Sequence, residues 1–327
     1  MAVITYIQAV TKALEEEMHR DEDVFVLGED VGARGGVFRA TDGLHATFGD
    51  ERVMDTPLAE SAIAGVAIGA AMYGMRPVAE MQFADFIMPA FNQIVSEAAK
   101  IRYRSNNDWD CPITIRAPYG GGVHGALYHS QSIEALFSSV PGLKVVMPST
   151  PYDVKGLLKA AIRDDDPVLF LEHKRAYRLI KGDVPDEDYT LPIGKADVKR
   201  EGEDITVITY GLCVHFALQA AEKLEKEGHS THILDLRTVY PLDQEAIIEA
   251  AKKTGKVLLI TEDNKEGSII GEVAAIIAGH CLFDLDAPIQ RLAGPDVPAM
   301  PYAPPMEKYF MMNPDKVETA MRDLAEY

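Results

Sequence analysis

Short, continuous apolar runs alternate along this chain with longer segments in which apolar side chains recur every third or fourth position. Continuous runs are typical of strands buried on both faces, and the longer period is typical of helices that pack one side against a core. Strands that alternate with helices favour a parallel sheet, so the predicted fold class is α/β. In the first half we expect strands at 24–27, 77–81, 113–116, 144–147 and 168–171, and helices at 5–20, about 86–104 and 151–163.

A polar stretch at residues 181–203, which contains Gly and Pro, interrupts this alternation and is the best candidate for a linker. The alternation then starts again and indicates a second α/β domain. We therefore predict two domains, residues 1–187 and residues 188–327. In the second domain we expect strands at 205–210, 233–236, 257–261 and 289–292, and helices at 214–227, 243–253 and 269–279.

The segment from Ala62 to Gly74 is apolar on nearly every side. Thr56 is a candidate N-cap and Pro57 suits the first helical position, so we expect a fully buried helix that begins there. Gly65 and Gly69 lie four residues apart on one face. Each glycine costs a helix about 1 kcal/mol relative to Ala, so we expect something to pack closely against that face.

Glu60 places one carboxylate in the first turn of this apolar segment. A buried charge is costly unless it has a partner or its pKa shifts. The rest of the sequence offers no obvious dedicated partner. Our hypothesis is therefore that a bound ligand supplies it.

The loop at residues 117–132 joins three consecutive glycines to two histidines, His124 and His129. Glycines let the backbone approach a ligand closely, and histidine titrates near neutrality. Both histidines are equally compatible with a structural or solvent-exposed role. A zinc site is disfavoured by the absence of an HExxH motif and of a third ligand nearby. No Gly-x-Ser-x-Gly or Cys–His signature supplies a covalent nucleophile, which suggests that a cofactor carries the difficult chemistry.

The formal net charge of −19 and the pI of about 4.9 argue against nucleic acid or an anionic membrane and allow a basic protein partner. The three cysteines form no CxxC pair, which suits a reducing compartment. We find no signal-peptide pattern and no apolar run of the ~20 residues that a membrane helix needs, so we expect a cytoplasmic protein.

The acidic run at 164–166 is either a solvated turn or part of a cation site.

Six short motifs follow one another along the chain: Leu-Gly-Glu-Asp-Val-Gly at 27–32, Asp-Thr-Pro-Leu-Ala-Glu at 55–60, Gln-Phe-Ala-Asp-Phe at 82–86, His-Ser-Gln at 129–131, Pro-Gly-Leu-Lys-Val-Val at 141–146 and Asp-Leu-Arg-Thr-Val at 235–239. Together they resemble the β subunits of the thiamine-diphosphate-dependent 2-oxo acid dehydrogenases, and the resemblance covers essentially the whole chain. Residues 121–132 are most similar to the branched-chain (2-oxoisovalerate) enzymes. A pyruvate enzyme is the alternative within the class, and a non-catalytic docking subunit is the alternative outside it.

The resemblance implies a transketolase-like pyrimidine-binding domain followed by a transketolase C-terminal domain, in an α2β2 heterotetramer. It implies oxidative decarboxylation of a small 2-oxo acid and transfer of the acyl group to lipoamide of an acyltransferase core. Thiamine diphosphate would be shared with the α subunit, which would hold Mg and the diphosphate, because the Gly-Asp-Gly…Asn motif is absent here.

The same resemblance assigns roles to individual residues. Glu60 would hydrogen-bond the aminopyrimidine ring nitrogen, and His129 would donate a proton during acyl transfer. Leu58 and Gln82 would line the pyrimidine pocket, and Glu29 and Phe86 would also belong to the cofactor site. A structural potassium ion would be held by Ile113, Thr114, Ala161, Asp164 and Asp166.

Overall fold

The computed structural model describes residues 2–327, which divide into two compact units. The first unit contains residues up to 119 together with 136–193, and the second contains 120–135 together with 194–327. The two predicted domains were contiguous in sequence, whereas the chain leaves the first unit at residue 120 and returns to it at residue 136. The segment 120–135 includes the loop with the two histidines.

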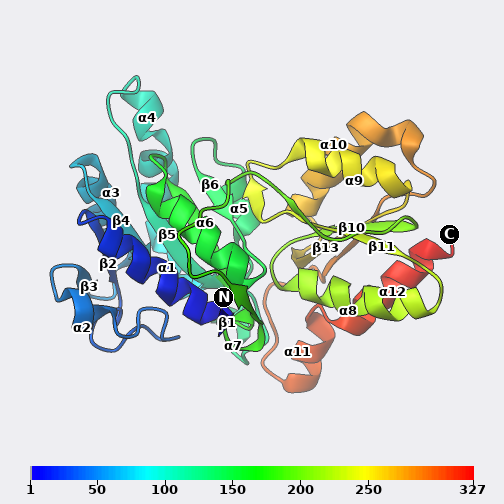
Figure 1. Ribbon diagram of the computed structural model, residues 1–327, viewed down its shortest axis with the longest axis horizontal. Helices are drawn as coiled ribbons and strands as arrows, with labels where there is room; N and C mark the ends of the chain where they lie inside the picture. Colours follow the sequence, from blue (N-terminus) through cyan, green and yellow to red (C-terminus); the bar gives the residue numbers. More distant parts are fainter. Residues whose placement is uncertain (1) are drawn as a thin grey trace. The chain divides into compact units, whose positions relative to one another are not determined.

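The first unit is built on a parallel sheet with the strand order β6-β7-β5-β4-β2-β3, and this arrangement confirms the predicted α/β class (Figure 1). Parallel strands place their carboxyl ends at one edge, which is where open α/β sheets bind ligands. The strands are β2 (Val24–Gly28), β3 (Val53–Asp55), β4 (Arg76–Glu80), β5 (Thr114–Tyr119), β6 (Lys144–Val146) and β7 (Val168–His173).

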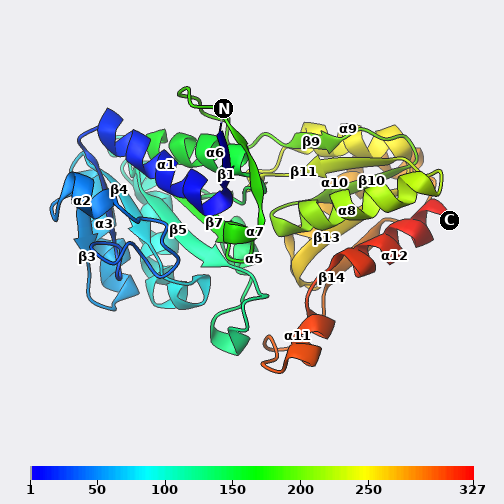
Figure 2. The ribbon, with the colours of Figure 1, turned by 60° about the horizontal axis from the view of Figure 1, so that its bottom comes forward.

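Two helices, α1 (Tyr6–Arg20) and α6 (Pro151–Arg163), pack side by side on one face of this sheet (Figure 2). Thr5 caps α1 in a capping box with Gln8, so the predicted start of this helix is confirmed within one residue. Helix α3 (Glu60–Met72) packs against β4 and the turn η1. The remaining short helices are α2 (Leu44–Phe48), α5 (Glu134–Ser138) and α7 (Ala176–Leu179).

The prediction of a single helix at about 86–104 is wrong, because this segment is a series of short helical turns with different hydrogen-bond spacing. It consists of the 3-10 turn η1 (Ala84–Ala90), the π turn η2 (Gln93–Glu97), the 3-10 turn η3 (Ala98–Lys100) and the α-helical turn α4 (Ile101–Arg104). Pro89 lies inside η1 and has no N–H to donate, so a continuous α-helical hydrogen-bond ladder cannot run through it.

The predicted linker at 181–203 contains two strands rather than irregular chain. β8 (Lys181–Val184) pairs antiparallel with β1 (Ala2–Thr5), and β9 (Asp197–Arg200) pairs antiparallel with β11 (Thr231–Asp235). Both strands lie at a sheet edge, where natural proteins place polar and charged side chains. Such strands lack the apolar run on which the prediction depended.

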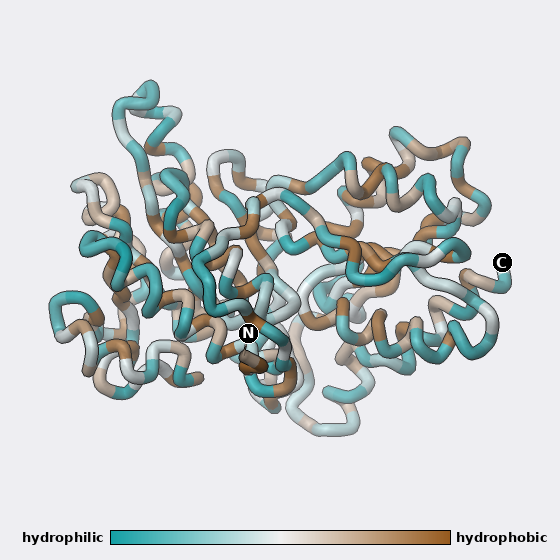
Figure 3. Tube along the Cα trace, viewed as in Figure 1, coloured by the Kyte–Doolittle hydropathy of each residue, from teal (hydrophilic) through white to brown (hydrophobic). Residues whose placement is uncertain are grey.

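The second unit has a sheet with the strand order β14-β13-β10-β11-β9, in which only β9 runs antiparallel. Its central strands are among the most hydrophobic parts of the chain (Figure 3). None of the helices in the described residues is long and apolar enough to cross a membrane. The other elements are β10 (Ile205–Thr209), β12 (Thr238–Tyr240), β13 (Val257–Asn264), β14 (Gln290–Gly294), α8 (Leu212–Lys226), α9 (Gln244–Thr254), α10 (Ile269–Cys281), α11 (Pro304–Phe310) and α12 (Pro314–Ala325), with short turns η4 (Ala126–Tyr128) and η5 (Leu282–Asp284).

Candidate active site

Glu60 is the first residue of α3, so this helix begins later than the expected start at Thr56 and Pro57. The main-chain N–H of Thr56 donates to the carbonyl of Gly28 over 2.9 Å, which keeps the chain extended beside β2 up to that point. The N-cap is Ala59, whose side chain cannot accept a hydrogen bond. The first N–H groups of α3 are therefore not capped by a side chain, and the helix dipole favours negative charge at Glu60.

The Glu60 side chain is buried without a partner. The residue is 8% exposed, and no hydrogen bond or ion pair joins it to another residue in 2–327. Its negative charge is felt at Glu29, whose pKa is raised by burial first and then by the charges of Asp30 and Glu60. Because the Glu60 carboxylate has no partner among the described residues, the site lacks a hydrogen-bond donor that another molecule can supply.

The other residues that the resemblance assigns to cofactor binding follow neighbouring strands. Glu29 follows β2, Leu58 comes after β3, and Gln82 comes after β4, and these three strands are paired in parallel. Their side chains therefore start from the same edge of the sheet as Glu60. Leu58 is 72% exposed, so a large apolar side chain stands open at this edge. Phe86 contacts Phe83, with 5.5 Å between the ring centroids.

A fully buried ion network lies in the same sheet and was not predicted. Arg116 donates to Glu80 over 2.6 Å and to both oxygens of Glu172 over 2.6 and 2.7 Å, and the Tyr177 hydroxyl donates to Glu172 over 2.6 Å. Burial raises the pKa of Glu80, and the nearby Arg116 opposes that shift. Bidentate pairing fixes these side chains on adjacent strands near the carboxyl-end edge.

Helix α3 is not fully buried, which corrects the expectation for this segment. Ala62, Gly65, Val66 and Gly69 form an exposed strip, with Val66 58% exposed. A Cβ atom added at either glycine would have no described neighbour within 4 Å. The apolar strip that should pack closely against something therefore has no partner among residues 2–327.

The second region of interest is the loop that carries His129, in the second unit. His124 and Ala126 adopt left-handed backbone angles, with φ of 57° and 51°. Such angles are uncommon for residues other than glycine and persist where surrounding contacts impose them. Between them, Gly125 lies so close to His129 that an added Cβ would come within 2.6 Å of the His129 Cβ. The position of His129 therefore depends on the path of this turn.

Side chains from the C-terminal part of the second unit hold the loop. Glu262 accepts a hydrogen bond from the main-chain N–H of Gly121 over 2.7 Å. Glu307 accepts one from the N–H of His124 over 3.2 Å, and its other oxygen lies 2.5 Å from His124 Nδ1. Sequence patterns did not indicate these carboxylates, because each is more than 100 residues from its partner in the chain.

A third contact buries an acidic group at the end of the same segment. The Tyr210 hydroxyl donates to Glu134 over 2.9 Å. Burial, followed by the nearby charge of Asp263, raises the pKa of Glu134 to about 8. Burial also raises the pKa of Asp263 to about 6. Near neutral pH this end of the loop therefore holds a proton.

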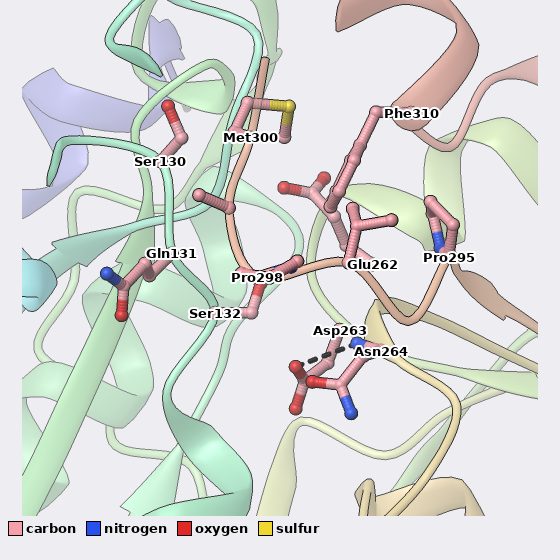
Figure 4. A pocket seen from close by; sticks show the side chains of 12 residues that line it. Ser130, Gln131, Ser132, Glu262, Asp263, Asn264, Pro295, Pro298, Met300 and Phe310 are labelled. Carbon is pink, nitrogen blue, oxygen red and sulfur yellow. Dashed lines mark hydrogen bonds between the residues drawn. The ribbon is translucent and has the colours of Figure 1, made fainter. Parts of the chain in front are cut away.

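A cavity of about 140 Å³ lies beside the residues that follow His129 (Figure 4). Figure 4 shows the hydrogen bond from the Asn264 main-chain N–H to Asp263, which measures 2.8 Å. Polar and apolar side chains together line this cavity, among them Ser132, Glu262, Asp263, Pro298, Met300 and Phe310.

At the predicted cation site, positively charged side chains already engage both carboxylates. Lys144 lies 2.7 and 2.6 Å from the two oxygens of Asp164, and Arg102 donates to Asp166 over 2.5 Å. No group of three or more His, Cys, Asp or Glu residues within 2–327 is arranged to hold a metal ion. The potassium site stays a prediction. With both carboxylates paired, the neutral oxygens of Ile113, Thr114 and Ala161 would have to bind the ion.

Comparison with known proteins shows the class. The transketolase pyrimidine-binding domain matches residues 2–180, and the transketolase C-terminal domain matches residues 194–317. A solved structure described as a split gene transketolase, inactive beta4 tetramer, is similar with a TM-score of 0.79 and 25% identity, over 99% of this chain and 98% of that one. The chain is thus a transketolase-type protein with both domains, as the resemblance predicted.

The family is narrower than that class. The chain is 81% identical over 327 residues to the 2-oxoisovalerate dehydrogenase subunit beta of Bacillus subtilis (strain 168), covering all of both chains. It is 49% identical over 324 residues to the pyruvate dehydrogenase E1 component subunit beta of the same strain, covering 99% of both. The chain belongs to the β subunits of the thiamine-diphosphate-dependent 2-oxo acid dehydrogenases, which confirms the predicted family.

Proposed function

We propose that this chain is the β subunit of a branched-chain 2-oxo acid dehydrogenase, which decarboxylates acids of the 2-oxoisovalerate type and passes the acyl group to lipoamide. The observation that carries the proposal is the difference in identity between the two relatives, 81% to the 2-oxoisovalerate enzyme and 49% to the pyruvate enzyme, each over nearly the full length. A pyruvate dehydrogenase subunit is the alternative.

The proposal requires an α subunit. This chain has no Gly-Asp-Gly motif, so another chain would have to hold Mg and the diphosphate. The exposed strip on α3 supports such a partner. Exposed apolar surface favours contact between subunits, and the small side chains of this strip leave room for another chain to approach closely. The name of the split gene transketolase structure, an inactive assembly of β chains, agrees with this requirement. We propose the α2β2 form.

The described residues fit the pyrimidine half of thiamine diphosphate, which supplies the nucleophile and the electron sink for decarboxylation when bound. Glu60 is a buried carboxylate without a partner, and it would accept a hydrogen bond from the aminopyrimidine ring nitrogen when that nitrogen is protonated. Leu58 and Gln82 would contact the ring from the neighbouring strand ends, and Glu29 and Phe86 would complete this side of the site.

His129 would act at a different step. A histidine can deliver a proton near neutral pH, and acyl transfer to lipoamide requires a proton at the sulfur that does not receive the acyl group. The turn around Gly125 would hold the imidazole at a fixed place for this transfer.

The substrate can be tested directly with the α2β2 enzyme. Decarboxylation of 2-oxoisovalerate and of pyruvate would be measured with an artificial electron acceptor, and kcat/KM should favour 2-oxoisovalerate. A preference for pyruvate would support the alternative. An assembled enzyme that decarboxylates neither acid would instead favour a docking subunit without chemistry.

The acyltransferase core is proposed as a second partner, docked on the C-terminal domain. The net charge of −19 favours a basic docking domain on the core. Exposed charges are screened over ~8–10 Å near physiological ionic strength, so binding of the assembled enzyme to the core should weaken steeply with salt. Affinity that stays constant as the salt concentration rises would contradict this docking mode.

We further infer that the protein works in a reducing compartment, the cytoplasm. Cys111, Cys213 and Cys281 are all buried as free thiols. Burial raises the pKa of the Cys111 thiol to about 12, so this thiol stays protonated and unreactive.

A further inference from the structure

The carboxylate of Glu307 is buried and contacts one residue. Glu307 lies in the first turn of α11 and is 4% exposed. Its side-chain oxygens bind the main-chain N–H and Nδ1 of His124, and no other residue in 2–327 contacts this carboxylate by a hydrogen bond or ion pair. A buried carboxylate is costly, so this arrangement stabilises one particular backbone position for His124.

His124 in turn determines the path of the turn before His129. Its left-handed φ of 57° is strained for a residue with a side chain, and the hydrogen bond to its N–H fixes the peptide plane that precedes this angle. The next residue is Gly125, where an added Cβ would come within 2.6 Å of the His129 Cβ and 2.9 Å of the His129 carbonyl oxygen. A shift at His124 is therefore passed directly to His129.

The imidazole of His124 is not itself buried. Its side chain is 66% exposed, whereas the Glu307 side chain that binds it is 6% exposed. A surface histidine gains little from such a contact, so the contact matters mainly for the backbone that it fixes. The side chains of Met300 and Met311 pack close to Gly121 at the start of the same loop, where an added Cβ would come within 2.6 Å of each.

We propose that Glu307 is a positioning residue for acyl transfer. By binding the main-chain N–H and the ring Nδ1 of His124, it sets the turn that places His129. The proposal rests on the role of His129 under the proposed function. Glu307 itself contacts no reacting atom.

The test uses the α2β2 enzyme and two partial reactions. Glu307→Ala should lower acyl transfer to lipoamide about 10- to 100-fold, since small misplacements of a reacting group cost up to about 10²-fold, while decarboxylation with an artificial acceptor changes less than threefold. Glu307→Gln should restore most of the transfer, because an amide can accept from the His124 N–H and donate to its ring. Lys308→Ala, on the exposed side of α11, is the matched control.

A double mutant separates positioning from general stability. With His129 already replaced by Ala, Glu307→Ala should cost no further transfer activity, because the group it positions is gone. Additive losses, or equal losses in both partial reactions, would overturn the proposal. If Glu307→Ala does not fold, Glu307→Asp provides the same test, because the shorter side chain draws the carboxylate back from the His124 main-chain N–H, and we expect it to lower transfer several-fold.

The same measurements distinguish the two levels of inference. If His129→Ala leaves acyl transfer intact, the role assigned to His129 is wrong, and the role of Glu307 is wrong with it. If His129→Ala impairs transfer and Glu307→Ala does not, only the positioning role is wrong.

Discussion

Two carboxylates in this protein have the same local setting and different surroundings. Glu60 and Glu307 each lie in the first turn of a helix, and each is more than nine-tenths buried. Glu307 binds the main-chain N–H and the ring Nδ1 of His124, whereas Glu60 has no partner in the described residues. The helix N-terminus favours a negative charge at both places and offsets part of the cost of burying a carboxylate there. Only the presence or absence of a partner separates a structural contact from a site that another molecule must complete.

The largest effect should come from closing the open side of α3. Gly65→Leu adds a side chain where nothing lies within 4 Å, so the isolated chain should keep its fold. We expect the variant to fail to assemble with the α subunit and to lose all activity, as measured by size-exclusion chromatography and decarboxylation. Gly279→Leu, at an exposed glycine of α10 with equally open space, is the control. Normal assembly of Gly65→Leu would show that this strip does not contact the α subunit.

The next largest effect concerns Glu60 directly. Glu60→Gln keeps the shape of the side chain but removes the negative charge that would accept the pyrimidine hydrogen bond. Loss of a positioned acid–base group typically costs 10²–10⁴-fold, and here decarboxylation with an artificial acceptor and acyl transfer should fall together. A variant that keeps near-wild-type decarboxylation would exclude Glu60 from cofactor activation.

His129→Ala should have a smaller and more selective effect. We expect acyl transfer to lipoamide to fall by about 10²-fold, while decarboxylation with an artificial acceptor is less affected, because the group acts at the later step. The ratio of the two rates is the quantity to measure. Equal losses in both reactions would place His129 at the first step instead.

The last effect is on stability rather than on activity and concerns the proton on Glu134, at the end of the same loop. Its pKa of about 8 lies above the ordinary 4.5, so the folded protein keeps a proton that the unfolded chain releases between these values. The free energy of unfolding should therefore fall as pH rises from about 4.5 to 8, by about 1.4 kcal/mol per unit of pKa difference as an upper bound.

Glu134→Gln keeps an acceptor for Tyr210 and cannot titrate. Its stability relative to the wild type should increase as pH rises through the same window and then level off, as measured by urea unfolding at several pH values. Asp263 shifts the wild-type curve in the same direction, since its pKa is about 6. Glu326→Gln, at an exposed position, should show no such trend.

Much of the fold could be predicted from local patterns, and the departures have physical reasons. Thr5 and the apolar spacing of the first helix are local signals, and the structure confirms them. The exposure of Gly65 and Val66 was not predicted, because a surface that another chain would cover has the same apolar composition as a core. Glu60 could be singled out because a charge in an apolar helix is conspicuous.

The contacts that hold the His129 loop could not be predicted. Glu307 and His124 are 183 residues apart, and neither the short helix around Glu307 nor its composition distinguishes this residue from the many exposed acidic residues. Arg116 was missed for a similar reason, because its two carboxylate partners come from other strands and only the sheet pairing brings them to it. Long-range polar pairs leave no periodic signal in a sequence.

The excursion of residues 120–135 out of the first unit has a consequence for exchanging parts between related enzymes. A chimera made with one crossover near residue 193 would combine the loop of one parent with the C-terminal half of the other. The recipient would then have to reproduce Glu262 and Glu307 at matching positions, or the loop would lose its anchors. Recombination that preserves this protein therefore needs three crossovers, one on each side of the loop and one near residue 193, so that loop and C-terminal half are inherited together.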